Sequence, residues 1–122
     1  MEVRRDEVTV SPGDIFVSKI RSVGDLAGVF EYDGETGYFY KYDQDRMGGT
    51  RVLAAIHIVS GKVDFAESDV EVRWGQGDEW VGLFIRGELW AAFGTSEKVG
   101  GNYRPGGHPR VPDSVIAAFP LR

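Results

Sequence analysis

The chain has few residues of the kinds that perform catalysis or bind metals. Its 122 residues include no cysteine and only two histidines, His57 and His108. Neither histidine has a second histidine or a carboxylate at metal-ligand spacing, and no serine lies in a Gly-x-Ser-x-Gly elbow. For His57, inside the apolar run 51–59, a partly buried, hydrogen-bonded strand residue is the favoured interpretation. These features leave enzymatic activity open but favour a non-enzymatic protein without metal or cofactor.

Three carboxylates lie close together in the sequence, at Glu31, Asp33 and Glu35. A pair of carboxylates can act as acid and base in glycoside hydrolysis. Asp33, however, precedes Gly34 in a predicted turn, and carboxylates at the end of a hairpin are usually solvated. Glu31 and Glu35 are therefore candidates for binding a partner rather than for catalysis.

A glycine-rich stretch at residues 100–107 contains one arginine, Arg104. The stretch matches neither the P-loop nor the dinucleotide-binding fingerprint, which need a strand before and a helix after the glycines. A flexible connection is the favoured interpretation. Arg104 is nevertheless the best single candidate for binding a carboxylate or phosphate, because its planar guanidinium can bind both oxygens of such a group.

Tyrosines are concentrated at Tyr38, Tyr40 and Tyr42, which alternate along one predicted strand and so share a face with Glu31. Tyrosine is enriched at protein interfaces because its ring provides a large contact area with a polar end. Ordinary packing between neighbouring strands would also explain the pattern. Packing is slightly favoured, and Tyr38 and Tyr40 are the candidates for a binding face.

The elements that must position these residues have the two-residue period of β-strands. Residues 26–32 and 35–42 flank Asp33-Gly34, the preferred sequence of a two-residue type I′ turn, in which both residues have positive φ. That turn predicts three facing pairs: Tyr32 with Glu35, Phe30 with Gly37, and Gly28 with Phe39. One face of this ribbon is predicted to carry core residues Phe30, Tyr32 and Phe39, and the other Val29, Glu31, Tyr38 and Tyr40.

The rest of the chain predicts further strands joined by glycine-containing turns. Strands are predicted at 14–21 and 70–74, a strand or short helix at 51–59, a tight hairpin at 80–93 that turns at 86–88, a loop at 94–110 and one or two helical turns at 112–119. The hairpin between Trp80 and Phe93 is apolar on both faces, which predicts a central or covered strand pair. The predicted fold is mainly β (β or α+β): a single domain over residues 1–122, an antiparallel meander built from hairpins with at most one or two short helices.

The hairpin also carries a resemblance to a known family. Its sequence Phe-Glu-x-Asp-Gly-Glu-Thr-Gly-Tyr-Phe-Tyr at residues 30–40 resembles the signature of small bacterial proteins known only as a domain of unknown function. The similarity continues through 53–58, 72–74, 83–85 and 103–104, and the chain departs from it at Ala54, where the family has an acidic residue. The resemblance implies a bacterial source and a compact β or α+β fold, and it implies no activity.

Charge and hydropathy narrow the possible partners. The net charge of −5 argues against nucleic-acid binding, which needs clustered basic residues. No apolar run approaches the roughly 20 residues that span a bilayer, so no membrane insertion is expected. The charged N-terminal residues lack the apolar segment of a secretory signal, which predicts a cytoplasmic protein.

The leading hypothesis is a non-enzymatic, protein-binding module that engages a basic partner through an acidic, tyrosine-bearing sheet face, as an immunity protein would engage a basic toxin. One alternative is a small-ligand-binding protein or enzyme with a pocket lined by Tyr38, Tyr40, His57 and Arg104. The other is a structural homodimer formed through the hairpin that begins at Trp80 and ends at Phe93.

Overall fold

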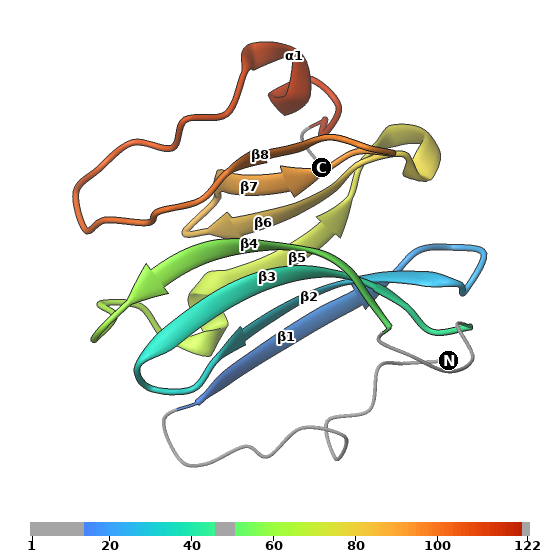
Figure 1. Cartoon of the computed structure of the whole chain (residues 1–122). Helices are drawn as coiled ribbons and strands as arrows, with labels where there is room; N and C mark the ends of the chain where they lie inside the picture. The colour runs from blue at the N-terminus through green and yellow to red at the C-terminus, as the bar shows by residue number, and fades with distance from the viewer. Residues whose placement is uncertain (1–13, 46–50, 121–122) are drawn as a thin grey trace.

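The fold consists of two four-stranded antiparallel sheets packed face to face (Figure 1). The structure, a computed structural model, describes residues 14–45 and 51–120. The first sheet contains, in spatial order, β1 (Ile15–Ile20), β2 (Leu26–Tyr32), β3 (Thr36–Asp43) and β4 (Val52–Ser60). The second contains, in spatial order, β5 (Val70–Trp74), β6 (Val81–Ile85), β7 (Glu88–Phe93) and β8 (Lys98–Gly100). Each sheet is a meander, so the predicted mainly β, hairpin-built fold is confirmed; its division into two sheets was not predicted.

Three short helical segments complete the described fold. The 3-10 turns η2 (Glu67–Asp69) and η3 (Gln76–Asp78) lie before and after β5, and α1 (Asp113–Ile116) follows the long C-terminal loop. The predicted helical turns at 112–119 are thus confirmed. Within the described residues, no helix has the length and apolar character needed to cross a membrane.

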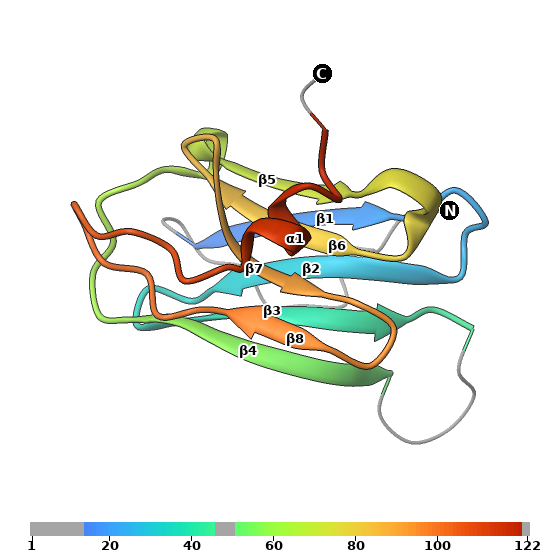
Figure 2. The same cartoon turned by 90° about the horizontal axis from the view of Figure 1, so that it is seen from above.

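The core lies between the two sheets, which overlap when the molecule is seen from above (Figure 2). Alternate residues of each strand point inward, as the two-residue period predicts. Phe30 and Phe39 of the first sheet are fully buried, and Phe39 stacks on Phe93 of the second sheet with 5.2 Å between ring centroids. The strand predicted at 70–74 is confirmed as β5, of which Val70 and Val72 are buried and Trp74 packs against the core.

The first hairpin has a wider loop than predicted. Tyr32 lies opposite Gly37 and Phe30 opposite Phe39, so all three predicted pairs are wrong by two residues. Gly34 has a φ of +94°, whereas Asp33 is not among the positive-φ residues, which excludes the type I′ turn. The reason is the Asp33 side chain, whose Oδ1 accepts hydrogen bonds from the backbone N–H groups of Glu35 (2.9 Å) and Thr36 (2.8 Å) and so stabilises a longer loop.

The predicted faces of this ribbon are nevertheless confirmed, because a shift of two residues preserves the alternation. Phe30, Tyr32 and Phe39 are all buried in the core between the sheets. Aromatic rings cover the glycines of this ribbon diagonally: a Cβ on Gly37 would lie 3.2 Å from the Phe30 ring, and one on Gly28 would lie 3.3 Å from the Phe39 ring.

The second hairpin has the two-residue turn that was predicted for the first. Arg86 and Gly87 have φ values of 51° and 81°, and Ile85 pairs with Glu88. Positive φ at both positions is the requirement of a type I′ turn. The tight hairpin predicted at 86–88 is therefore confirmed, with Glu88 as the first residue of β7.

The strands of this second hairpin are covered on both faces by other parts of the same chain. Every residue of β6 is buried, as is every residue of β7 after Glu88. One face lies in the core, and the other packs under the C-terminal segment through the cluster Phe84, Leu89, Ala92, Val111, Val115 and Phe119. The predicted covering is confirmed, and it comes from this chain's own segments.

Two other segments bear on the predictions: the first decides between two alternatives, and the second differs from the predicted loop. The run at 51–59, predicted as strand or short helix, forms β4. The segment 94–110, predicted as a loop, includes the three-residue strand β8, whose Val99 pairs with Ala92 of β7. A strand this short contains too few residues to show a period.

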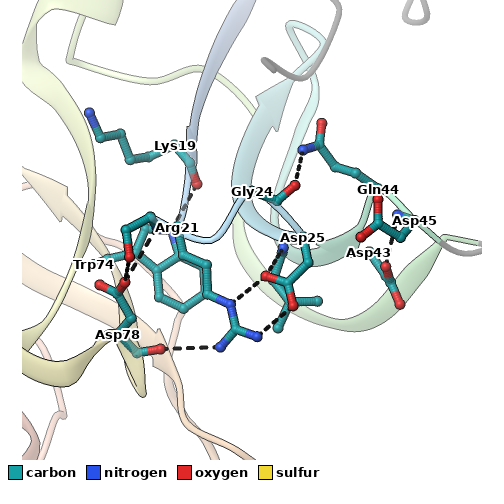
Figure 3. A network of polar contacts seen from close by, with 11 residues as sticks. Lys19, Arg21, Gly24, Asp25, Asp43, Gln44, Asp45, Trp74 and Asp78 are labelled. Atoms are coloured by element: carbon teal, nitrogen blue, oxygen red, sulfur yellow. Dashed lines mark hydrogen bonds and ion pairs between the residues drawn. The ribbon is translucent and has the colours of Figure 1, made fainter.

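A polar network joins the two sheets at one end of the molecule (Figure 3). Arg21 follows β1 and binds Asp25 through two contacts, Nε to Oδ1 at 2.5 Å and Nη2 to Oδ2 at 2.6 Å. Its Nη1 reaches the carbonyl oxygen of Asp78 in η3 at 3.5 Å, and the Asp78 carboxylate accepts a hydrogen bond from the Ser22 hydroxyl. Trp74 donates its indole N–H to the Lys19 carbonyl at 2.9 Å.

The Arg21–Asp25 pair predicts acid sensitivity of folding. Hydrogen bonds from Arg21 lower the pKa of Asp25 from 3.8 to about 2. A carboxyl group with a lowered pKa in the folded state stabilises the fold above its unfolded pKa and loses that contribution as the pH falls through the folded value. The stability difference between wild type and Asp25→Asn, measured by urea unfolding, should therefore be largest near neutral pH and shrink between about pH 4 and about pH 2. A stability difference that stays constant down to about pH 2 would contradict this prediction. So would the same pH dependence of the stability difference for the exposed control Glu79→Gln.

Candidate functional site

Four of the six predicted binding residues lie together on the outward side of the first sheet. Glu31 of β2 is opposite Tyr38 of β3, which is in turn opposite His57 of β4. The Tyr38 ring stacks beside Tyr40 at 6.1 Å and meets His57 edge to face at 5.4 Å. Tyr38 is 37% exposed, which is high for an aromatic ring in a strand. We call this group of Glu31, Tyr38, Tyr40 and His57 the tyrosine face.

The tyrosine face continues into an apolar cluster on the same side of the sheet. Phe16, Ala27 and Val29 are buried there, with Tyr40 among the partly buried residues that pack against them. The cross-strand packing explanation therefore holds for Tyr40, whereas Tyr38 projects its ring to the surface. His57 is half-buried and its Nε2 lies 2.8 Å from the Ser60 hydroxyl, which confirms the hydrogen-bonded strand residue expected at this position.

The electrostatics of the face are set by carboxylates. Burial raises the pKa of Glu31, and the nearby negative charges of Asp33 and Asp14 raise it further. Burial and the charge of Glu31 likewise raise the pKa of Tyr40. Burial is the larger cause of both shifts, and the neighbouring carboxylates add to it in the same direction.

The basic residues of the same strands point to the other side. Lys41 of β3 extends its ammonium group to the carbonyl oxygen of Gly94 at 2.8 Å, beside the second sheet, and burial lowers its pKa. Lys19 of β1 is opposite Gly28, whose missing side chain would meet Val81 of the second sheet. Alternation therefore separates the lysines of this sheet from the tyrosine face.

Glu35 lies in the loop of the first hairpin, at the end of the same ribbon, and is exposed. Its carbonyl oxygen accepts a hydrogen bond from Gly61 at 2.5 Å, which ties the hairpin loop to the end of β4. This contact fixes the backbone of Glu35 at the end of the ribbon that carries Glu31 and Tyr38.

Arg104, the sixth predicted residue, borders a different hollow. A cavity of about 600 Å³ lies under the C-terminal loop and is lined by Arg104 together with Trp90, Asn102, His108 and Arg110. His57 instead borders a smaller hollow of about 280 Å³ with Lys98. Tyr38 and Tyr40 are not among the residues that line either hollow, so the four residues of the predicted pocket do not converge there.

The cavity residues Trp90, Asn102, His108 and Arg110 were missed by sequence reasoning. Arg110 and His108 lie within ten residues of Arg104, and this basic cluster beside a glycine-rich stretch was the available signal. Trp90 gave no such signal, because it is distant in sequence and belongs to an apolar strand. Among the residues that the structure describes, no group of three or more His, Asp or Glu is arranged to hold a metal ion.

The fold and the site define a small antiparallel β protein of two stacked meanders, with an acidic aromatic face on one sheet. Residues 10–112 match the model of the family described as "Uncharacterized protein conserved in bacteria (DUF2251)". The chain belongs to this family, which confirms the bacterial domain-of-unknown-function family that the hairpin sequence resembles. No curated protein and no solved structure matches the chain.

Proposed function

We propose that this protein is a non-enzymatic, cytoplasmic binding module that engages a basic partner protein through the tyrosine face. The observation that carries the proposal is the juxtaposition of an exposed tyrosine with a carboxylate on a strand face from which Lys19 and Lys41 point away. Tyrosine provides contact area at small cost in side-chain entropy, and Glu31 with Glu35 provides charge complementarity.

The partial burial of Glu31 strengthens this argument. Its raised pKa means that burial disfavours the ionised form, and a guanidinium or ammonium from a partner would offset that cost. Tyr38, beside it, is 37% exposed, and the face of its ring accepts a cationic side chain. One arginine side chain of a partner therefore interacts favourably with both the Glu31 carboxylate and the Tyr38 ring.

The proposal is tested by the double charge reversal Glu31→Lys/Glu35→Lys. Proteins retained from a bacterial lysate are identified, produced in pure form, and their association rates with the immobilised protein are measured. We expect a partner with a basic surface whose association rate falls steeply between about 0.01 M and about 1 M salt, as the screening length falls from about 30 Å to about 3 Å. The double reversal should reduce that rate at low salt by about tenfold or more.

The matched control is Glu79→Lys/Glu88→Lys. It changes the net charge by the same amount as the double reversal, but at two exposed residues elsewhere. Glu79 lies next to the second sheet, and Glu88 is the first residue of β7. This control should leave the rate within about threefold of wild type, because only the local field of the tyrosine face steers the partner. Equal effects of the two double variants, or a partner whose binding ignores both salt and the Glu31/Glu35 reversal, would refute the proposal.

A further inference from the structure

The cavity under the C-terminal loop combines features that ordinary packing leaves unexplained. Its volume of about 600 Å³ lies in the usual range for small-molecule sites. Its wall includes two arginines, one histidine and one asparagine, and none of the described residues that line it is acidic. Such a lining is rich in hydrogen-bond donors and positive charge.

The arginines of the cavity have no partner within the described part of the chain. Neither Arg104 nor Arg110 forms an ion pair there, and the side chains of Asn102 and His108 make no hydrogen bond with described residues. Glu88 borders an adjacent hollow with Arg104, but no ion pair joins the two. Both guanidinium groups are therefore available to an anion.

Trp90 provides a second, independent observation. Trp90 borders the cavity and is 3% exposed, and its indole Nε1 is buried without a hydrogen-bond partner among the described residues. A buried N–H group without an acceptor is rare in native proteins because its desolvation is uncompensated. An acceptor atom of a ligand would complete it.

The backbone holds Trp90 in this position by an irregularity of the sheet. In the pairing of β6 with β7, Leu83 is opposite Ala91 and Phe84 opposite Leu89, so Trp90 is an extra residue in a bulge. Bulges re-aim side chains and are frequent beside functional sites. Tyr103 packs edge to face on the Trp90 ring at 4.7 Å, and its own hydroxyl donates to Asp64 at 2.7 Å.

The backbone N–H groups of residues 101–103 are used within the fold, which leaves ligand binding to side chains. Gly101 donates its N–H to the Trp90 carbonyl (2.8 Å), and Asn102 and Tyr103 donate theirs to the carbonyls of His57 (3.2 Å) and Ile58 (2.7 Å). Because these N–H groups already donate to carbonyl groups of the fold, they cannot bind a phosphate as those of a P-loop do. The positive groups that border the cavity are the guanidinium groups of Arg104 and Arg110.

From these observations we infer that the cavity binds a small organic anion, with a carboxylate or phosphate group held by Arg104 and Arg110 and an acceptor atom near the Trp90 indole. A lone inorganic ion would leave most of the cavity unfilled, whereas an organic anion matches both its volume and its charge. The site is separate from the tyrosine face and is independent of the proposed partner binding.

The test uses citrate, glycerol phosphate and uncharged glycerol as probes, titrated into the full chain by calorimetry and by tryptophan fluorescence. We expect saturable binding of at least one of the two anions and none of glycerol; which anion binds separates a carboxylate from a phosphate ligand. Arg104→Gln/Arg110→Gln should weaken binding by about tenfold or more, the effect of removing charged hydrogen bonds. Trp90→Phe keeps an aromatic side chain but removes the indole N–H, and should weaken binding by about threefold or more.

The matched control is Lys62→Gln, which removes one exposed positive charge outside the cavity and should leave affinity within about twofold. Circular dichroism confirms that each variant is folded. Absence of saturable binding by both anions, or equal weakening by Lys62→Gln and the double arginine variant, would overturn the inference. Unchanged affinity in Trp90→Phe would overturn the role of the indole donor.

Discussion

Phe39→Ala is expected to lower the free energy of unfolding by about 3–5 kcal/mol, the usual cost of removing a fully buried phenylalanine. The Phe39 side chain is 0% exposed and stacks on Phe93 across the interface of the two sheets. It also lies against Gly28, where the neighbouring strand has no side chain to move into the space. The loss therefore leaves a cavity that the surrounding backbone cannot close, and urea unfolding would measure it.

The neighbouring residue provides the control for this prediction. Tyr38→Ala removes an aromatic ring from the same strand, but that ring is 37% exposed on the outward side. We expect it to cost about 1 kcal/mol or less. Equal losses for the two variants would show that the sheets are not held together by the inward faces described above.

Gly100→Ala is expected to lower the free energy of unfolding by about 3 kcal/mol or more, combining two kinds of strain. Gly100 has a φ of +86°, which side chains rarely adopt. A Cβ at this position would also lie 2.2 Å from the Trp90 carbonyl oxygen and 2.9 Å from the Ala91 Cα. Both are backbone atoms of β7, so the clash can be relieved only by moving β8 away from its partner.

Gly106→Ala separates the two contributions. Gly106 has a similar φ of +71°, but no atom lies within 4 Å of the position its Cβ would take. Only the conformational penalty of about 1–2 kcal/mol should apply there. If Gly100→Ala lowered the free energy of unfolding no more than Gly106→Ala does, that result would contradict the close approach of β8 to the Trp90 backbone.

The faces of the first hairpin were predictable from the sequence, whereas its register was not. Alternation of apolar and polar residues determines which side chains are buried, and Phe30 and Phe39 follow it. The register depends on the turn, and there the Asp33 side chain competes with the backbone by binding the N–H groups of Glu35 and Thr36. The preference of Asp-Gly for a two-residue turn contains no information about that competition.

The candidate site was predictable to the extent that it is local. Tyr38, Tyr40 and Glu31 lie on one face because they belong to adjacent strands of one hairpin, and His57 joins them through the next strand. The cavity at Arg104 depends instead on Trp90, which reaches it through a bulge. A bulge interrupts the two-residue period, so no pattern in the apolar strand β7 indicates that Trp90 borders this cavity.

The backbone hydrogen bonds of Asn102 and Tyr103 also bear on solubility. β4 is the last strand of its sheet, and an edge strand with free carbonyl groups is a template on which another chain can add. The carbonyls of His57 and Ile58 already accept hydrogen bonds from the segment that follows β8. Along this stretch the edge of β4 is protected from aggregation, because the carbonyl groups that a strand of a second molecule would bind are already occupied.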